Sequence, residues 1–312
     1  MRRRPGRRAR TALAALTVMG VVAGCGLGPG PGTGGVTLTV TQGFGTRDIG
    51  AVSAAHVPGS ETVMRMLERS FHLTTRYGGG FVEAINGHSG TSNQRDWFYY
   101  VNGVQAKQGA ATTSVNRGDT IWFDLHDWRA TNSVPAVIGS FPEPFRHGIG
   151  GKRLPTTVEC AADLSAACTR VASALAAAGV PAASQLLGTG SGPDTLGVVV
   201  GTWRELQPEV AASLIEHGPS ASGVYARFAG PHGERLQLLN PAGQVVTTLG
   251  PGAGLVAATA DSSSAPTWLI TGTDARGVAA AAAAVSARSL HDRFALAVSG
   301  GRQIPLPVGG EG

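Results

Sequence analysis

Turns rich in glycine divide residues 36–129 into short runs of strand character. The first run, VTLTV (36–40), alternates β-branched residues as a strand does. The later runs are HLTTRY (72–77), FVEAI (81–85), WFYYV (97–101) and TIWFDLHDW (120–128). The turns that separate them contain Gly78-Gly79-Gly80, Asn86-Gly87, Asn102-Gly103 and Arg117-Gly118-Asp119. This pattern predicts a sheet of short strands.

One segment in this region has helical periodicity instead. ETVMRMLERSF follows Pro58-Gly59-Ser60, and Ser60 is expected to be its N-cap. Three apolar residues fall on one helical face: Val63, Leu67 and Phe71. One helix among several strands predicts a small α+β domain at 36–129, with the helix covering one face of the sheet.

The run RDWFYYVNG places four aromatic residues together in a chain with 6% aromatic residues. Alternation along a strand puts Trp97, Tyr99 and Val101 on one face. Phe98 and Tyr100 then share the other face. One interpretation is that both faces pack, one under the helix and one against a neighbouring strand or domain. The other is that the rings line a recognition surface for a flat ligand or a partner.

Residues 132–312 have a different pattern and predict a second, mixed α/β domain. Strands are expected at VPAVIG (134–139), LGVVVGT (196–202) and TWLITGT (267–273), and a helix from Asp163, its N-cap, to about residue 178. A weak internal repeat is visible, in which LGVVVGT, a helix and the strand SGVYARF match TWLITGT, a helix and the strand RFALAV.

Both repeated strands end in Gly-Thr, at Gly201-Thr202 and Gly272-Thr273. Ligands of open parallel sheets bind beyond the carboxyl ends of the strands, so these ends are candidate site positions. The alternative is that glycine only permits a tight turn from strand to helix.

The first 24 residues indicate an export signal. MRRRPGRRAR carries six arginines and no acid, and the uncharged apolar run after it is too short to span a membrane. Val22-Ala23-Gly24-Cys25 resembles a bacterial lipobox, which predicts lipidation of Cys25; the alternative is a signal cleaved elsewhere. Residues 25–35 are rich in Gly and Pro and are expected to tether the fold to the outer face of the cell membrane.

Without the signal the net charge changes from +5 to −1, so the basic balance belongs to the signal. We therefore expect no nucleic-acid partner. The bias toward Ala, Gly and Arg is typical of actinobacteria. The 42% hydrophobic content is enough to build real cores.

Two cysteines remain beside Cys25. Cys160 and Cys168 form an even pair in an exported protein and predict a disulfide across a short loop; the alternative is two free thiols. No histidine lies near them in sequence, so a metal site is not expected.

The sequence contains no recognised catalytic motif, such as a nucleophile elbow, Walker loop or HExxH. Asp124 and His126 fall on one face of a strand, where they either pair for acid–base chemistry or lie on the exposed face of an edge strand. His147, His217 and His232 are scattered in presumed turns. We expect no catalytic and no metal site. An enzyme in 132–312 is the alternative if Asp194, Glu143 or His147 cluster near the Gly-Thr ends.

Residues 36–129 resemble the DUF4430 domain, which is similar to the C-terminal β-domain of the cobalamin carriers transcobalamin and intrinsic factor. The resemblance rests on these pieces in order: VTLTV, VMRMLERSF, FVEAINGHSG, RDWFYYVNG and QGAATTSVNRGDTIWFDLHDW. It implies a β-grasp-like fold. In the carriers the domain closes over an α-helical barrel, whereas the second half of this chain is a different α/β region.

The same resemblance implies candidate ligand-binding residues that face a corrin ring: Phe81, Phe98, Tyr99, Tyr100 and Gln108. We therefore expect a non-catalytic, lipid-anchored binding protein of the cell envelope. Its ligand would be either a small molecule or an envelope partner. The resemblance implies a corrinoid as the small molecule, which the protein would pass to a membrane transporter. A structural or adhesion protein without a small ligand is the alternative. No cofactor is expected.

Overall fold

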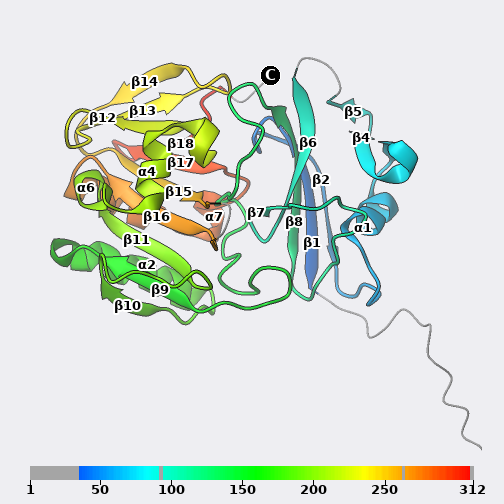
Figure 1. The fold of residues 1–312 in the computed structure, drawn as a ribbon, viewed down its shortest axis with the longest axis horizontal. Helices are drawn as coiled ribbons and strands as arrows, with labels where there is room; N and C mark the ends of the chain where they lie inside the picture. The colour runs from blue at the N-terminus through cyan, green and yellow to red at the C-terminus, as the bar shows by residue number, and fades with distance from the viewer. Residues whose placement is uncertain (1–34, 91–93, 262–263, 310–312) are drawn as a thin grey trace, which may run out of the picture.

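The computed structural model describes residues 35–90, 94–261 and 264–309, which form an α+β protein of two halves (Figure 1). The first half extends to β8 and the second begins at β9. Within the described residues, every helix is too short or too polar to cross a membrane. The predicted signal segment, Cys25 and the tether up to Gly34 lie outside the described residues.

The first half is built on a five-stranded sheet with the strand order β2-β1-β8-β6-β7. The elements of the first half are β1 (Val36–Gln42), β2 (Arg47–Ala54), α1 (Val63–Ser70), β3 (Leu73–Arg76), η1 (Tyr77–Gly79), β4 (Phe81–Ile85), β5 (His88–Ser89), β6 (Arg95–Val101), β7 (Val104–Gln105) and β8 (Thr120–Asp127). Of these, β3, β4 and β5 form a separate three-stranded sheet. β1 and β8 are parallel neighbours, and the other pairs are antiparallel. This is the β-grasp-like arrangement that was expected.

Each face of this sheet has its own partner (Figure 1). On one face, Leu38, Ile121 and Phe123 share a core with Val63 and Leu67 of α1. On the other face, Tyr100 and Trp122 share a core with residues of the second half. Alternation along the strands therefore divides the aromatic run as predicted, and both of its faces are covered.

One local prediction for this half was wrong, and one strand was missed. The N-cap of α1 is Thr62, whose hydroxyl accepts a hydrogen bond from Arg65 N at 3.3 Å, and not Ser60. The strand β2 was not predicted, because Arg47, Asp48 and Gly50 interrupt its alternation and it lies at the edge of the sheet.

The second half contains a seven-stranded mixed sheet, ordered β10-β9-β11-β16-β15-β17-β18, and a three-stranded sheet, ordered β12-β13-β14. The first sheet uses β9 (Thr156–Cys160), β10 (Ala183–Leu186), β11 (Leu196–Thr202), β15 (Gly254–Thr259), β16 (Thr267–Gly272), β17 (Ala295–Ser299) and β18 (Arg302–Leu306). The second uses β12 (Ala226–Ala229), β13 (Arg235–Leu239) and β14 (Val245–Leu249). The helices are η2 (Ala162–Leu164), α2 (Ser165–Ala177), α3 (Trp203–Leu206), α4 (Val210–Glu216), α5 (Pro219–Ser222), α6 (Ala275–Ala283) and α7 (Ala287–Leu290).

Some predictions for this half need correction. Residues 134–139, predicted as a strand, form only an isolated bridge, Val104↔Ala136. Their backbone makes hydrogen bonds to Gly103 and Gln105 at the two sides of Val104 and, among the described residues, to no strand longer than β7. Asp163 lies in η2 and does not cap α2, which begins at Ser165. The repeated order of strand, helix and strand is present, as β11, α4 and β12 and as β16, α6 and β17, and β11 and β16 pair in parallel. The two copies differ in their last strand, because β12 joins the small sheet whereas β17 stays in the large one.

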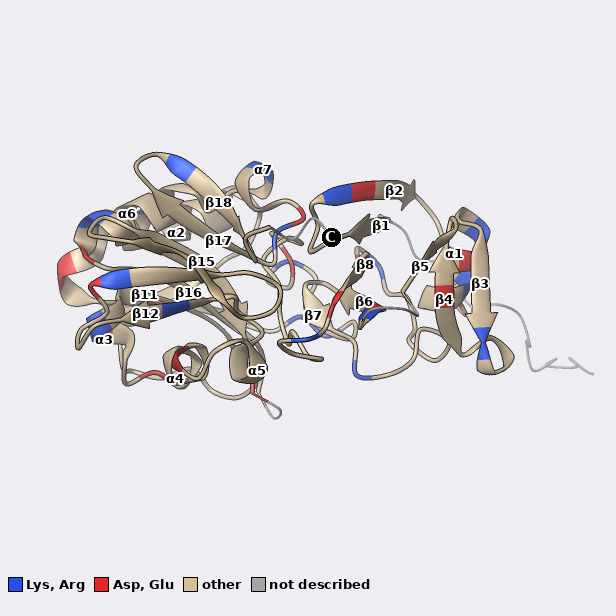
Figure 2. Cartoon of the chain, turned by 90° about the horizontal axis from the view of Figure 1, so that it is seen from above, with Lys and Arg blue, Asp and Glu red and all other residues tan. Residues whose placement is uncertain are grey.

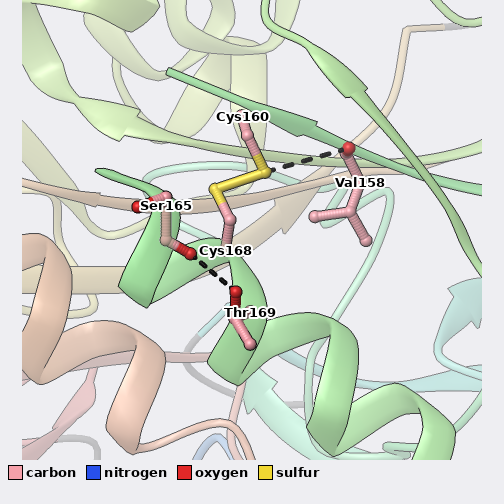
Figure 3. Close-up of a disulfide and its surroundings, with 5 residues drawn as sticks. All are labelled: Val158, Cys160, Ser165, Cys168 and Thr169. Atoms are coloured by element: carbon pink, nitrogen blue, oxygen red, sulfur yellow. Dashed lines mark hydrogen bonds between the residues drawn. A yellow bond between two sulfur atoms is a disulfide. The ribbon is translucent and has the colours of Figure 1, made fainter. Parts of the chain in front are cut away.

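The predicted disulfide is present between Cys160 at the end of β9 and Cys168 in the first turn of α2 (Figure 3). It fixes the start of the helix to the carboxyl end of the strand. The predictions of a disulfide and of an α+β fold are therefore confirmed.

Replacing both cysteines, Cys160→Ser with Cys168→Ser, is expected to lower the free energy of unfolding by about 2 kcal/mol, because the bond restricts the unfolded chain. The loop is short, with a sequence separation of 8, so a larger loss is not expected. Urea titration measures this difference. A reducing agent should shift the unfolding midpoint of the wild type and not that of the double variant, and equal midpoints for the two oxidised proteins would contradict the prediction.

Candidate binding cleft

A cleft of about 1180 Å³ lies between the two halves. The first half contributes Val101, Val104, Gln105, Ala106, Lys107, Gln108, Thr113, Ser114 and Asn116. The segment that links the halves contributes Ser133, Pro135, Ile149 and Gly150, and the second half contributes Leu214, Ala221, Ala260, Asp261, Ser264 and Pro266. This volume lies above the usual range for drug-sized ligands, so the cleft can hold a large one.

Hydrogen bonds join the linking segment to β7 at one wall of the cleft. Gln105 N donates to Pro135 O at 3.0 Å, and Val137 N donates to Gly103 O at 2.8 Å. The side chain of Gln105 accepts hydrogen bonds from Ser133 Oγ and Val134 N, both at 3.0 Å. These bonds fix the linking segment against β7, so one wall of the cleft is rigidly placed.

The lining mixes apolar and neutral polar side chains. Among the described residues on it, the charged ones are Lys107 and Asp261. Such a surface suits an amphipathic ligand that carries amide or hydroxyl groups rather than several charges.

A second pocket of about 280 Å³ borders the cleft and shares Leu214, Ala260, Asp261 and Ser264 with it. Its wall includes the buried Glu159, whose carboxylate accepts hydrogen bonds from Ser191 Oγ at 2.6 Å and Gly190 N at 3.2 Å. Burial, together with the charge of Glu159, raises the pKa of the neighbouring Glu209. Sequence reasoning missed Glu159, since a single acid in the short strand TTVEC gives no local signal of burial.

The structure divides the five predicted ligand-binding residues between two places. Gln108 lines the cleft. The hydroxyl of Tyr99 donates to Gln108 O at 2.5 Å, so Tyr99 supports that loop from the helix-covered face. Phe81 is half-buried on β4, near Tyr77. A Cβ on Gly109 would lie 3.9 Å from Gly80 O, which places the Gln108 loop beside the start of β4.

Phe98 and Tyr100 face the second half and are not among the residues that line the cleft. The Phe98 ring stacks on His126 with centroids 4.4 Å apart. Tyr100 is fully buried, and its ring meets Phe294 edge-on at 5.6 Å. Burial, and secondly the charge of Asp124, raise the pKa of Tyr100 well above its usual value. These two rings form part of the contact between the halves.

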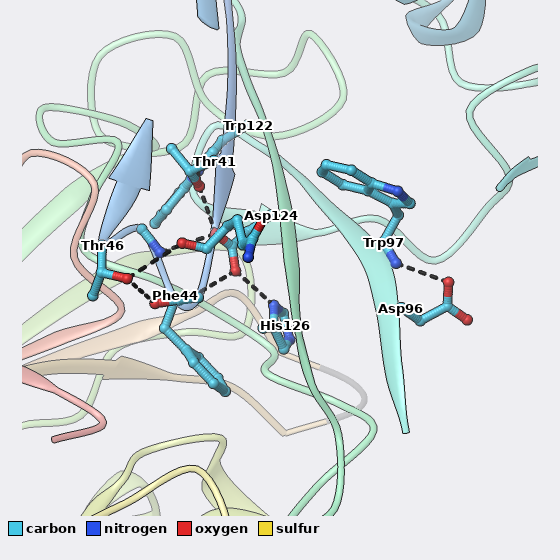
Figure 4. A network of polar contacts seen from close by, with 11 residues as sticks. Thr41, Phe44, Thr46, Asp96, Trp97, Trp122, Asp124 and His126 are labelled. Atoms are coloured by element: carbon cyan, nitrogen blue, oxygen red, sulfur yellow. Dashed lines mark hydrogen bonds and ion pairs between the residues drawn. The ribbon is translucent and has the colours of Figure 1, made fainter. Parts of the chain in front are cut away.

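Asp124 and His126 do pair, as one interpretation predicted, with His126 Nδ1 2.9 Å from Asp124 Oδ2. The alternative, an exposed face of an edge strand, is wrong: β8 lies inside the sheet, and both side chains are almost fully buried. The Asp124 carboxylate also accepts hydrogen bonds from Thr41 Oγ1 at 2.5 Å and from the backbone N–H groups of Phe44 and Gly45, each at 2.9 Å (Figure 4). The buried pair therefore anchors the β1–β2 loop and has no access to a substrate.

The other polar residues considered for catalysis lie away from the Gly-Thr strand ends. Glu143 accepts hydrogen bonds from His147 N at 2.8 Å and from His147 Nδ1 at 2.6 Å. Burial raises the pKa of Glu143. Phe145, between them, contacts Trp268 near the amino end of β16, and Asp194 precedes the amino end of β11. These residues therefore lie at the opposite end of the sheet.

The Gly-Thr ends themselves are closely packed. A Cβ on Gly272 would lie 2.6 Å from the backbone of Gly277 in α6, and a Cβ on Gly201 would lie 2.8 Å from Leu206. These contacts favour the interpretation that glycine permits a close approach of helix and strand. Across the described residues, no cluster of His, Cys, Asp and Glu could hold a metal ion.

The fold and cleft thus define a two-part α+β protein with a large cleft between its halves. A family model described as a domain of unknown function (DUF4430) matches residues 60–127, which confirms the resemblance to that domain over α1 to β8. No curated protein matches the chain. A solved structure from Ruminococcus gnavus ATCC 29149, named as a candidate metal binding protein, aligns with 20% identity and a TM-score of 0.24, over 30% of this chain and 95% of that one.

The substitution Asp124→Ala is expected to lower the free energy of unfolding by about 3 kcal/mol or more, because it leaves several buried donors without an acceptor. Asp127→Ala is the matched control: Asp127 bonds to the exposed Arg129, so its loss should cost less than about 1 kcal/mol. Urea titration of both variants measures the difference, and equal losses would contradict the role assigned to Asp124.

Proposed function

We propose that this protein is a non-catalytic binding protein of the cell envelope that takes a small molecule into the cleft between its halves. The observation that carries this proposal is the cleft itself, about 1180 Å³ in volume, with the predicted binding residue Gln108 on its wall. Its mixed apolar and amide-rich lining favours a large amphipathic ligand.

A corrinoid is the first ligand to test. It is large and amphipathic and carries many amide groups, and the similarity of the first half to the β-domain of cobalamin carriers suggests it. The cleft would hold it between the Gln108 loop and the α4–α5 region, where Leu214 and Ala221 line the opposite wall. The ligand would then pass to a membrane transporter.

The test is a titration of the chain from Gly26 onward with cobalamin, followed by calorimetry and by the visible spectrum of the vitamin. This chain contains every residue of the three cores, which span residues 36–306. Micromolar or tighter binding, about −8 kcal/mol or better, is expected. Gln108→Ala should weaken binding about fivefold, the usual effect of one neutral hydrogen bond.

Two blocking variants make the test specific to the cleft. Ala106→Trp and Ala221→Trp fill it from opposite walls, and each should weaken binding at least about tenfold by removing its volume. Ala287→Trp on the exposed surface of α7 is the matched control and should bind as the wild type does. An absence of heat and of spectral change would remove the corrinoid, and the structural or adhesion alternative would then stand.

We also propose that Cys25 carries a lipid that holds the fold at the outer face of the membrane. The support is the sequence Val22-Ala23-Gly24-Cys25 after an apolar run, together with the Gly/Pro-rich residues before Val36.

The expected result is that the protein fractionates with membranes and incorporates labelled fatty acid when the full chain is expressed in a bacterial host. Cys25→Ala should abolish the label and prevent stable membrane attachment, because the apolar run of the signal is too short to span a membrane. Cys160→Ser with Cys168→Ser is the control and should keep the label. A labelled Cys25→Ala protein would contradict the proposal.

A further inference from the structure

The first strand enters the fold beside a loop that carries a positive charge. Thr37 N donates to Asp119 O at 3.0 Å, so the start of β1 lies against the turn that contains Arg117. Arg117 is exposed, whereas Asp119 is buried. Whatever precedes Val36 therefore joins the fold next to this turn.

A second loop lies against the same turn. Asn102 Nδ2 donates to Asp119 Oδ1 at 2.9 Å and to Gly148 O at 2.8 Å. A Cβ on Gly151 would lie 2.8 Å from Asn116 Oδ1, and a Cβ on Gly118 would lie 2.5 Å from the ring of His147. Residues 146–153 are thus fixed against residues 116–119 by the buried amide of Asn102 and by the close approach of Gly151 to Asn116 and of Gly118 to His147.

These two loops present four exposed cations: Arg117, Arg146, Lys152 and Arg153. We call these four residues the basic surface. Asp119 in the first loop and Glu143, just before the second, are buried acids that accept hydrogen bonds from within the protein. Asp194 approaches Lys152 at 3.7 Å, but both side chains are largely exposed, so this pair is weak. The surface therefore keeps a positive charge, although the chain after the signal has a net charge of −1.

The loops of the basic surface also form one end of the cleft. Asn116, Ile149 and Gly150 line the cleft and are neighbours of Arg117 and Lys152 in sequence. Other cations are distributed over both halves, for example on β2 and β3 and near α3, α6 and α7, as the blue segments in Figure 2 show. What distinguishes the basic surface is its place beside both the start of β1 and the cleft.

We propose that the basic surface binds the anionic headgroups of a phospholipid membrane and turns the cleft toward that membrane. A cationic surface is attracted to anionic lipid over about one Debye length, and each Lys or Arg that reaches the headgroups adds to the attraction. The orientation of the cleft rests on the proposed function. If Cys25 carries the anchor, residues 26–35 span at most about 35 Å, which keeps the basic surface near the bilayer.

Vesicle binding tests this proposal without the anchor. The chain from Gly26 onward is sedimented with vesicles of phosphatidylcholine alone or of phosphatidylcholine with about 30% phosphatidylglycerol, at low salt and at about 0.5 M salt. Binding is expected only to the anionic vesicles at low salt. The variant Arg117→Gln, Arg146→Gln, Lys152→Gln, Arg153→Gln should bind at least about tenfold more weakly.

The matched control removes the same charge from the other half: Arg204→Gln, Arg276→Gln, Arg288→Gln, Arg302→Gln, all exposed residues. It should bind anionic vesicles as the wild type does. Equal binding to both kinds of vesicle, no binding to either, or the same loss in both variants would overturn the proposal. Cobalamin titration of the basic-surface variant separates the two proposals. Loss of vesicle binding with unchanged cobalamin binding would show that the substitutions affect the basic surface and not the cleft.

Discussion

The buried carboxylate of Asp124 links the sheet of the first half to the loop that contacts the second half. It lies on β8 and receives hydrogen bonds from β1, from the β1–β2 loop and from His126. In a low-dielectric interior such a group is stable only when its hydrogen bonds are made, so the loop that supplies them has one conformation. That loop presents Phe44 to Tyr225 and Phe294 of the second half, with ring centroids 5.1 Å apart in both cases.

The contact between this loop and the second half sets the geometry of the cleft. Gly45 has φ +76°, and a Cβ there would lie 2.0 Å from Asp292 O, so the backbones of the two halves meet directly. The rings of Tyr100, Trp122 and Phe294 fill the region between them. A close-packed aromatic contact of this kind allows little sliding. The distance between the cleft walls is therefore determined by the aromatic contact.

Sequence patterns predicted the elements with strong alternation and missed those held by distant contacts. The strand around Leu38 was predicted from its alternation, and those around Phe98 and Phe123 were predicted from their runs of aromatic and β-branched residues between turns. β18 was missed because Pro305 lies inside it, which is tolerated at the edge of a sheet. The burial of His126 could not be read from its strand, since the residues that cover it, Phe44 and Phe294, are far away in the chain. The candidate site shows the same limit. Gln108 was suggested by a family resemblance and does lie on the cleft. No local pattern marks Leu214 or Asp261, because the wall that they form is created only when the two halves pack together.

The shared aromatic core has a consequence for how the chain can be divided. A cut near residue 130 would separate the first half with its own sheet and its own helix-covered core. Such a fragment would expose Tyr100, Trp122 and Phe44 to water, together with the buried Asp124–His126 pair. Exposed aromatic patches of that kind favour self-association. The first half of this chain is thus not an interchangeable module, since one face of its sheet is completed by residues of the second half such as Tyr225 and Phe294.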